Sequence, residues 1–243
     1  MYNRMQHTAK KPQEADEVLF DGFIKELAEK IMMQYEKPLL TGILYHLEET
    51  LTEYQIKSII MQLSYLSEDE KIGIKKRKQA MIEDLSVYFM EHETASIDGL
   101  VLFRLKRYRT ILEQVAKQLL DAYYAKKEYE EFLHLLRYFI KVQRERPNVL
   151  HLVLSNCGEY TLYNEKKEDI TALCMLEFVS EDTLLADSMD DLLLSILITT
   201  APQHLVLHNI QHMKNRELFV TIAKVFDTIE YCGGCPLCQK EKL

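Results

Sequence analysis

Three cysteines close to the end of the chain are the residues best suited to chemistry. Cys232, Cys235 and Cys238 stand at two-residue spacing in the stretch CGGCPLC, and the chain holds five cysteines in all. Thiolates this close together can converge on one soft metal ion or exchange a disulfide, whereas isolated core cysteines rarely cluster in this way. The spacing therefore predicts a C-terminal metal site or a redox-active thiol group.

The elements that must position this tail supply a fourth ligand. The pattern predicts a βαβ unit with parallel strands, made of a strand over 204–208, a helix over 215–226 and a strand over 228–232. His208 ends the first strand and Cys232 ends the second, so both emerge at the same edge of the sheet, where open α/β sheets place ligands. His208 or His212 then completes a Cys3His zinc site, because zinc prefers tetrahedral thiolate and imidazole ligands.

Other uses of the thiols stay open. An iron–sulfur cluster needs a fourth cysteine, for which only the distant Cys157 or Cys174 is available. A thioredoxin-type redox role has the spacing, but in that fold C-x-x-C opens a helix near the start of a domain. The remaining alternative is that the thiols sit in a Gly/Pro turn and bind nothing.

Residues 147–243 are predicted to form a small α/β domain that ends in the Cys-rich tail. Two β-prone runs over 149–154 and 160–163 follow Pro147 and predict a hairpin that precedes the βαβ unit. The run over 172–178 fits a strand or a short helix, and 187–199 predicts a helix.

Residues 16–146 are predicted to form a helical domain, preceded by a flexible N-terminus over 1–15. The predicted helices cover 16–36, 38–50, 52–64, 68–92, 99–125 and 128–141. Ser96 or Asp98 is expected to cap the fifth. One apolar stripe follows the sixth: Phe132, Leu135, Leu136, Phe139 and Ile140. The fold class is therefore α+β, a mainly helical N-terminal body with a small C-terminal α/β layer.

Composition narrows the class of protein. The chain is 47% hydrophobic, with 7 glycines and 5 prolines in 243 residues, as is typical of a helix-dominated globular protein. The N-terminus has no apolar signal region, and the densest apolar run, over 192–198, is far shorter than the roughly 20 residues of a membrane span. We therefore expect a cytoplasmic protein with no membrane span, in which the cysteines are thiols or metal ligands.

The charge is unevenly distributed and bears on the choice of partner. Residues 147–243 carry 7 Lys and Arg against 14 Asp and Glu, so the net charge of −8 belongs to the C-terminal part. This disfavours nucleic acid as its partner, because affinity for phosphate needs clustered positive charge. Two short basic clusters, over 75–78 and 104–109, leave a nucleic-acid-binding alternative that a steep salt dependence would support.

Three stretches carry a family resemblance. They are IDGLVLFRLK over 97–106, the segment 127–143 with EF at 131–132 and LLRYF at 135–139, and the closing strand with Cys232 and Cys235. In this order they resemble the YtxC-like sporulation proteins, over most of the chain from about residue 17. The resemblance implies a cytoplasmic protein of spore-forming Firmicutes that is linked to sporulation, with no established enzymatic activity and no catalytic residues to carry over.

The sequence therefore favours a non-enzymatic interaction or regulatory protein that acts through protein partners during sporulation. A structural zinc site would be formed by Cys232, Cys235, Cys238 and His208. The alternative is a thiol-dependent redox enzyme that uses the same CxxCxxC stretch, which requires a thiol of low pKa beside a cleft.

Overall fold

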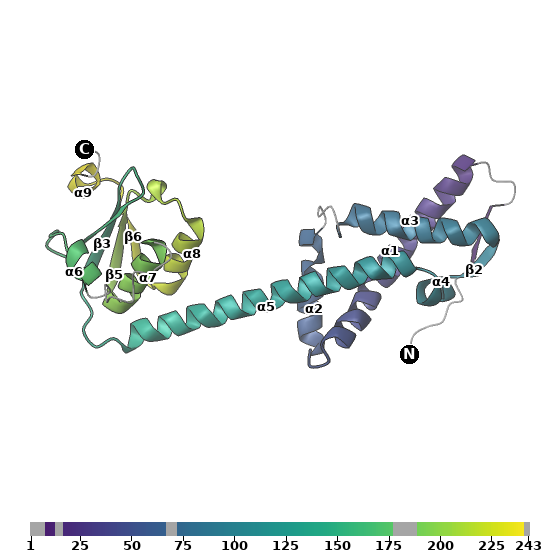
Figure 1. The fold of residues 1–243 in the computed structure, drawn as a ribbon, viewed down its shortest axis with the longest axis horizontal. Helices are drawn as coiled ribbons and strands as arrows, with labels where there is room; N and C mark the ends of the chain where they lie inside the picture. The colour runs from purple at the N-terminus through teal and green to yellow at the C-terminus, as the bar shows by residue number, and fades with distance from the viewer. Residues whose placement is uncertain (1–7, 13–16, 67–71, 177–188, 241–243) are drawn as a thin grey trace. The chain divides into compact units, whose positions relative to one another are not determined.

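In the computed structural model, two compact units follow one another along the chain (Figure 1). The structure describes residues 8–12, 17–66, 72–176 and 189–240. The first unit, Met1–Lys126, is helical, and the second, Lys127–Leu243, contains a four-stranded sheet, which confirms the predicted α+β class. The units divide inside helix α5 (Lys106–Val142), whereas the change of pattern at Pro147 marks the approach to the first strand of the sheet.

The helical unit packs its helices around one apolar core. Its elements are β1 (Thr8–Lys10), α1 (Glu17–Leu47), α2 (Glu53–Met61), the 3-10 helix η1 (Gln62–Leu66), α3 (Ile74–Glu91), β2 (Thr94–Ser96), α4 (Ile97–Phe103) and the first part of α5. Strands β1 and β2 pair antiparallel. The first four residues of the helix predicted over 68–92 lie outside the described residues. Helix α3 begins at Ile74.

Helix α1 continues through Pro38, so the prediction of two helices separated there is wrong. A proline inside a helix removes one backbone hydrogen bond and costs about 3 kcal/mol. Leu40 and Leu44, which follow the proline, are fully buried in the same core as Ile24 and Ile31, which precede it. Tertiary packing on both sides of Pro38 thus outweighs the local preference for a break.

The helix predicted over 99–125 is also interrupted and extended. Ser96 caps the short helix α4, as predicted, because its hydroxyl accepts a hydrogen bond from the Gly99 N–H. Helix α4 ends at Phe103, with Arg104 as its C-cap. Helix α5 then runs without interruption to Val142 instead of ending near residue 125.

A buried ion pair joins three helices of the helical unit. Arg77 of α3 is 3% exposed, and its Nε and Nη2 donate to the Glu36 carboxylate of α1 at 3.1 and 3.2 Å. Its Nη1 donates to the Ile72 carbonyl at 2.7 Å, and the Tyr108 hydroxyl of α5 donates to Glu36 at 2.6 Å. Burial, together with the Glu36 carboxylate, raises the pKa of Tyr108 far above its usual range, so this hydroxyl stays a donor.

The second unit contains the predicted hairpin and βαβ unit. Its elements are the end of α5, β3 (Val149–Leu154), β4 (Tyr160–Tyr163), α6 (Thr171–Leu176), α7 (Met189–Thr200), β5 (His204–His208), the 3-10 helix η3 (Ile210–His212), α8 (Arg216–Val225), β6 (Ile229–Tyr231) and α9 (Pro236–Lys240). The strand order is β4-β3-β5-β6, with β3 and β4 antiparallel and β3, β5 and β6 parallel. The ambiguous run over 172–178 is helical as far as Leu176.

The two faces of this sheet have different environments. Alternate side chains such as Leu152 and Leu207 belong to a core shared with α6, α7, α8 and the end of α5. The opposite face carries His151, Val206 and His208, and the short α9 packs there through Leu237 against Val153 and Tyr163. The candidate site lies on this second face.

The apolar stripe predicted on α5 is only half correct. Leu136 and Ile140 are buried in the core of the sheet unit together with Leu133, but Phe132, Leu135 and Phe139 are each 44–49% exposed. The helical period of the apolar residues predicted the helix correctly. The apolar residues occupy a wider part of its surface than the sheet unit covers, so those on one side of the helix are exposed.

Arg137 of α5 caps the C-terminus of α8. Its Nε and Nη2 donate to the Lys224 carbonyl at 2.8 and 2.6 Å. A cation at this end of a helix also interacts favourably with the helix dipole. We expect Arg137→Met to lower the free energy of unfolding of the sheet unit by about 1 kcal/mol. Urea denaturation will measure the change, with Arg144→Met, an exposed arginine beyond the end of α5, as the control that leaves stability unchanged.

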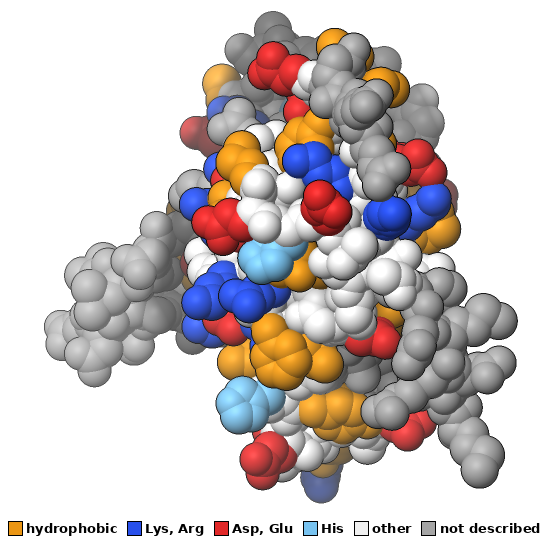
Figure 2. Space-filling model, turned by 90° about the vertical axis from the view of Figure 1, so that its right-hand side faces the viewer, with side chains coloured by type: hydrophobic (Ala, Val, Ile, Leu, Met, Phe, Trp, Pro, Cys, Tyr) orange, Lys and Arg blue, Asp and Glu red, His pale blue; other side chains and the backbone are white. Residues whose placement is uncertain are grey.

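One face of the molecule is mixed in charge, because its Lys and Arg side chains are interspersed with Asp, Glu and apolar side chains (Figure 2). No helix among the described residues combines the length and apolarity needed to cross a bilayer.

Candidate metal centre

The candidate site lies at the carboxyl ends of β5 and β6. His208 is the last residue of β5, and Cys232 directly follows β6, where its N–H donates to the Leu207 carbonyl at 2.9 Å. The chain then turns back so that Cys235 precedes α9 and Cys238 lies within it. The parallel pairing of β5 with β6 therefore brings His208 and Cys232 to one edge, as the predicted topology required.

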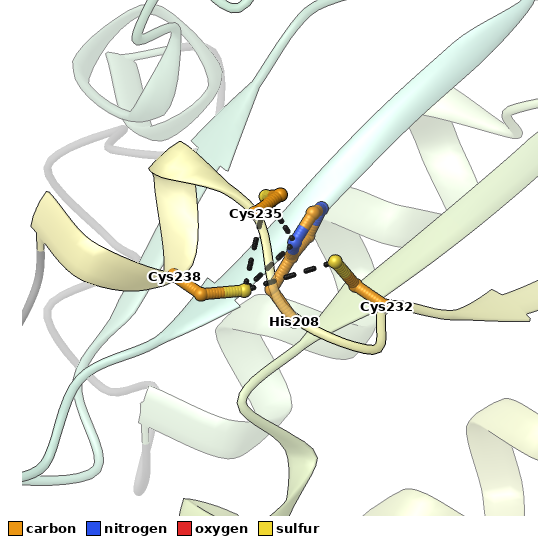
Figure 3. A group of neighbouring side chains, drawn as sticks. All are labelled: His208, Cys232, Cys235 and Cys238. Atoms are coloured by element: carbon orange, nitrogen blue, oxygen red, sulfur yellow. Dashed lines mark hydrogen bonds between the residues drawn. The ribbon is translucent and has the colours of Figure 1, made fainter.

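Four potential ligand atoms converge at this edge (Figure 3). The Cys238 Sγ lies 3.8 Å from the Sγ atoms of both Cys232 and Cys235. The Nδ1 atom of His208 lies 3.4 Å from the Cys238 Sγ and 3.5 Å from the Cys235 Sγ. All four ligand atoms lie within 4.8 Å of one another, close enough to hold one metal ion.

The turn between the first two cysteines depends on a glycine. Gly234 has φ of 125°, a conformation that side chains with a Cβ rarely adopt, and its N–H lies 3.4 Å from the Cys232 Sγ. The Gly-Gly pair thus allows the chain to reverse within two residues and aim both sulfurs at the same point.

The thiols differ in how readily they ionise. Burial acts to raise the pKa of Cys235, but hydrogen bonds from the Cys238 N–H and neighbouring groups outweigh it and leave that pKa below its usual value. The hydrogen bond from the Gly234 N–H lowers the pKa of Cys232. Burial and the two neighbouring thiols together raise that pKa by more, so the pKa of Cys232 lies above its usual value. Cys235 is therefore more readily ionised than Cys232, and a thiolate is the form that binds metal.

His208 is held in the neutral form that a metal ligand needs. The residue is 2% exposed, and burial lowers its pKa to about 4, with His151 and Lys167 acting in the same direction. Its second ring nitrogen, Nε2, lies 3.0 Å from Nδ1 of His151, a residue of β3. A neutral imidazole at pH 7 presents a lone pair to a cation without first losing a proton.

Asn209 fixes the tail over this edge of the sheet. It adopts the left-handed conformation, with φ of 54°, which asparagine tolerates better than most residues. Its side-chain amide donates to the Leu154 carbonyl at 3.2 Å and to the Cys238 carbonyl at 3.3 Å. Residues from β3, the end of β5 and α9 are thereby joined beside the four ligand atoms.

The other sequence candidates lie outside this group. His212, the alternative fourth ligand, is in η3 and contacts Gln211 instead. Cys157 is exposed in the turn after β3, and Cys174 is buried in the core on the helical side of the sheet. Neither cysteine belongs to the cluster, so the fourth thiolate that an iron–sulfur site requires does not come from them.

Four residues of the two basic clusters form ion pairs or hydrogen bonds within the helical unit. Arg77 is buried against Glu36, and Lys78 pairs with the exposed Glu29. In the second cluster, Arg107 lies 4.0 Å from the Asp84 carboxylate, and Arg109 donates to backbone carbonyls of α4. Arg77, Lys78, Arg107 and Arg109 therefore have partners within the helical unit.

An open groove adjoins the cysteine cluster on the sheet face that carries His151 and His208. It has a volume of about 380 Å³, and its lining includes His151, Glu165, Lys167, Glu230 and Cys235. Sequence reasoning did not single out His151 or Asn209. The alternation of side chains in β3 places His151 on one face, but its neighbour across the sheet depends on the register between β3 and β5.

Comparison with known proteins gives one consistent result. The model of the YtxC-like family matches residues 23–228. "Uncharacterized protein YtxC" of Bacillus subtilis (strain 168) is 30% identical over 156 residues, which cover 62% of this chain and 52% of that protein. The match thus spans about half the length of that curated relative. No solved structure matches the chain.

Proposed function

Because the chain belongs to the YtxC-like family, we propose that it is a cytoplasmic interaction or regulatory protein linked to sporulation, with a structural zinc site at its C-terminus. Cys232, Cys235, Cys238 and His208 would hold the zinc ion. The zinc would join the tail after β6 to the end of β5 and so stabilise the sheet at the carboxyl ends of these two strands.

The spacing of the four ligand atoms is the observation that carries this proposal. In a tetrahedral zinc site with Zn–S bonds of about 2.3 Å and Zn–N bonds of about 2.0 Å, the sulfurs lie about 3.8 Å apart and each lies about 3.5 Å from the nitrogen. The Cys238 Sγ is 3.8 Å from two sulfurs, and the His208 Nδ1 is 3.4 and 3.5 Å from two sulfurs.

The ligand types favour zinc in a structural role. Soft thiolates select zinc, copper(I) or iron–sulfur clusters, and a set of three thiolates with one imidazole is typical of structural zinc. Four protein ligands also complete the tetrahedron and leave no position for a substrate, unlike catalytic zinc, which keeps an open position.

The role in protein binding is supported by an apolar surface on α5. Five large apolar residues within eleven positions are 44–58% exposed: Phe132, Leu135, Tyr138, Phe139 and Val142. Apolar patches of this kind are common at protein–protein contacts. The link to sporulation is supported by the family resemblance alone, and the yield of heat-resistant spores from a host that lacks the protein will test it.

Elemental analysis of the protein, purified without a chelator and without a histidine tag, tests the zinc site. We expect about one zinc per chain, and we expect the three C-terminal thiols to resist a thiol reagent until a chelator is added. The exposed Cys157 should react at once and thus serves as an internal control. A metal-free protein with freely reactive C-terminal thiols contradicts the proposal.

A thiol-dependent redox enzyme is the second candidate, and one observation favours it. The pKa of Cys235 is lowered, and Cys235 lines the groove beside the cluster. This candidate requires one C-terminal thiol of the metal-free protein to be alkylated near pH 7 much faster than Cys157. Equal alkylation rates would rule it out.

A further inference from the structure

The two ring nitrogens of His208 face different partners. Its Nδ1 lies 3.4 Å from the Cys238 Sγ and 3.5 Å from the Cys235 Sγ. Its Nε2 lies 3.0 Å from Nδ1 of His151. One nitrogen is therefore directed at the cysteines and the other at a second histidine.

We propose that His151 is a positioning residue for the metal site, which accepts a hydrogen bond from His208 and so keeps the Nδ1 of His208 free for the metal. This inference rests on the proposed zinc site. A neutral imidazole carries its proton on only one nitrogen, and the nitrogen that binds a metal must present its lone pair. If Nδ1 binds the metal, Nε2 carries the proton, and His151 Nδ1 is the acceptor within reach.

Metal-binding histidines almost always donate their second N–H to a hydrogen-bond acceptor, usually a carboxylate, a backbone carbonyl or water. The acceptor fixes the tautomer and the orientation of the ring, and its loss commonly weakens metal affinity by 10–100-fold. His151 can accept at Nδ1 when its own proton is on Nε2. The groove lined by His151, Glu165, Lys167 and Glu230 offers water and carboxylates as acceptors for that proton.

The sheet holds the two histidines in fixed positions. Strands β3 and β5 are parallel neighbours, with His151 opposite Val206 and Val153 opposite His208. The side chains of His151 and His208 therefore lie on the same face as diagonal neighbours, within reach of long side chains. Because both residues belong to central strands, their separation does not depend on the conformation of a loop.

Packing of the two rings alone does not explain why His151 lies beside His208. The ring centroids are 5.2 Å apart and the planes are tilted by 54°, so the rings meet through their nitrogen edges and are not stacked. If His151 served only to fill space, an apolar ring would replace it. If it serves as an acceptor, a side chain with an oxygen in the place of Nδ1 should replace it.

Two substitutions with opposite expectations separate these roles. His151→Asn places an amide oxygen at the position of Nδ1 but removes most of the ring, whereas His151→Phe keeps the ring and removes the acceptor. Zinc affinity will be measured by competition with a chromophoric chelator. We expect His151→Phe to bind zinc about 10–100-fold more weakly than the unaltered protein and His151→Asn to bind within about threefold of it.

A measurement on the unaltered zinc-loaded protein gives a second test that does not depend on a variant folding. Long-range proton–nitrogen NMR of the imidazole rings should show His208 protonated at Nε2 and His151 bare at Nδ1. A proton on His151 Nδ1 would overturn the inference, as would Phe and Asn variants that bind zinc equally well. If the unaltered protein binds no zinc, the proposed function itself fails and the inference fails with it.

Discussion

If Cys232, Cys235, Cys238 and His208 hold zinc as proposed, replacing Cys238 with serine will remove the zinc and loosen the C-terminal tail. The Cys238 Sγ lies close to all three other ligand atoms, at 3.8 Å from both other sulfurs and 3.4 Å from His208 Nδ1. Serine supplies no thiolate, and three remaining ligands do not complete a tetrahedron. We expect the zinc content of the purified protein to fall at least tenfold, on the order of the loss of affinity that even weaker perturbations of such sites cause.

Amide hydrogen exchange will report the structural effect of the same substitution. Because zinc binding contributes directly to folding in sites of this kind, residues 232–240 should exchange much faster in Cys238→Ser than in the zinc-loaded protein. Cys157→Ser, which alters an exposed thiol in the turn after β3, is the matched control and should retain zinc and protection. Retention of zinc by Cys238→Ser would show that Cys238 is not a ligand.

Replacing Glu36 with leucine will strongly destabilise the helical unit. Arg77 would lose the carboxylate that accepts from its Nε and Nη2, and Tyr108 would lose the acceptor of its hydroxyl. Removal of one partner from a buried ion pair leaves an uncompensated charge, which typically costs 3–5 kcal/mol. Urea denaturation followed by circular dichroism should show a loss of about 3–5 kcal/mol in the free energy of unfolding of this unit.

Two further variants separate the cost of the unpaired charge from other effects. Glu29→Leu removes the partner of Lys78 at an exposed position, where ion pairs contribute at most about 1 kcal/mol, so it should change stability little. Arg77→Met in the Glu36→Leu background removes the unpaired guanidinium and should recover much of the lost stability. Equal losses from Glu36→Leu and Glu29→Leu would contradict the interpretation of a buried ion pair.

The sequence predicted which side chains meet at the carboxyl ends of β5 and β6 better than it predicted the boundaries of the helices. Strand and helix signals over 204–232, together with the rule that a βαβ unit has parallel strands, were enough to place His208 beside Cys232. The choice between His208 and His212 depended on how the chain leaves β5, since the left-handed Asn209 turns the chain into η3. The sequence pattern contains no signal of comparable strength for that turn.

The errors share a physical cause, because each concerns contacts between residues far apart in the chain. Pro38 lies inside α1 because residues on both its sides pack on the same core. Phe132 and Phe139 are exposed because the sheet covers only the neighbouring face of α5. His151 could not be recognised as the neighbour of His208 without the register of β3 against β5.

Helix α5 contributes to two hydrophobic cores, which makes the stability of each unit depend on the other. Leu112, Val115 and Leu119 are buried in the helical unit, and Leu133, Leu136 and Ile140 are buried in the sheet unit. The intervening turns around Lys126 and Lys127 are exposed and rely on both ends for their helical structure, because helix formation is cooperative. Unfolding of one unit would therefore unwind these turns and begin to expose the other core, so the two melting transitions should overlap more closely than those of independent domains.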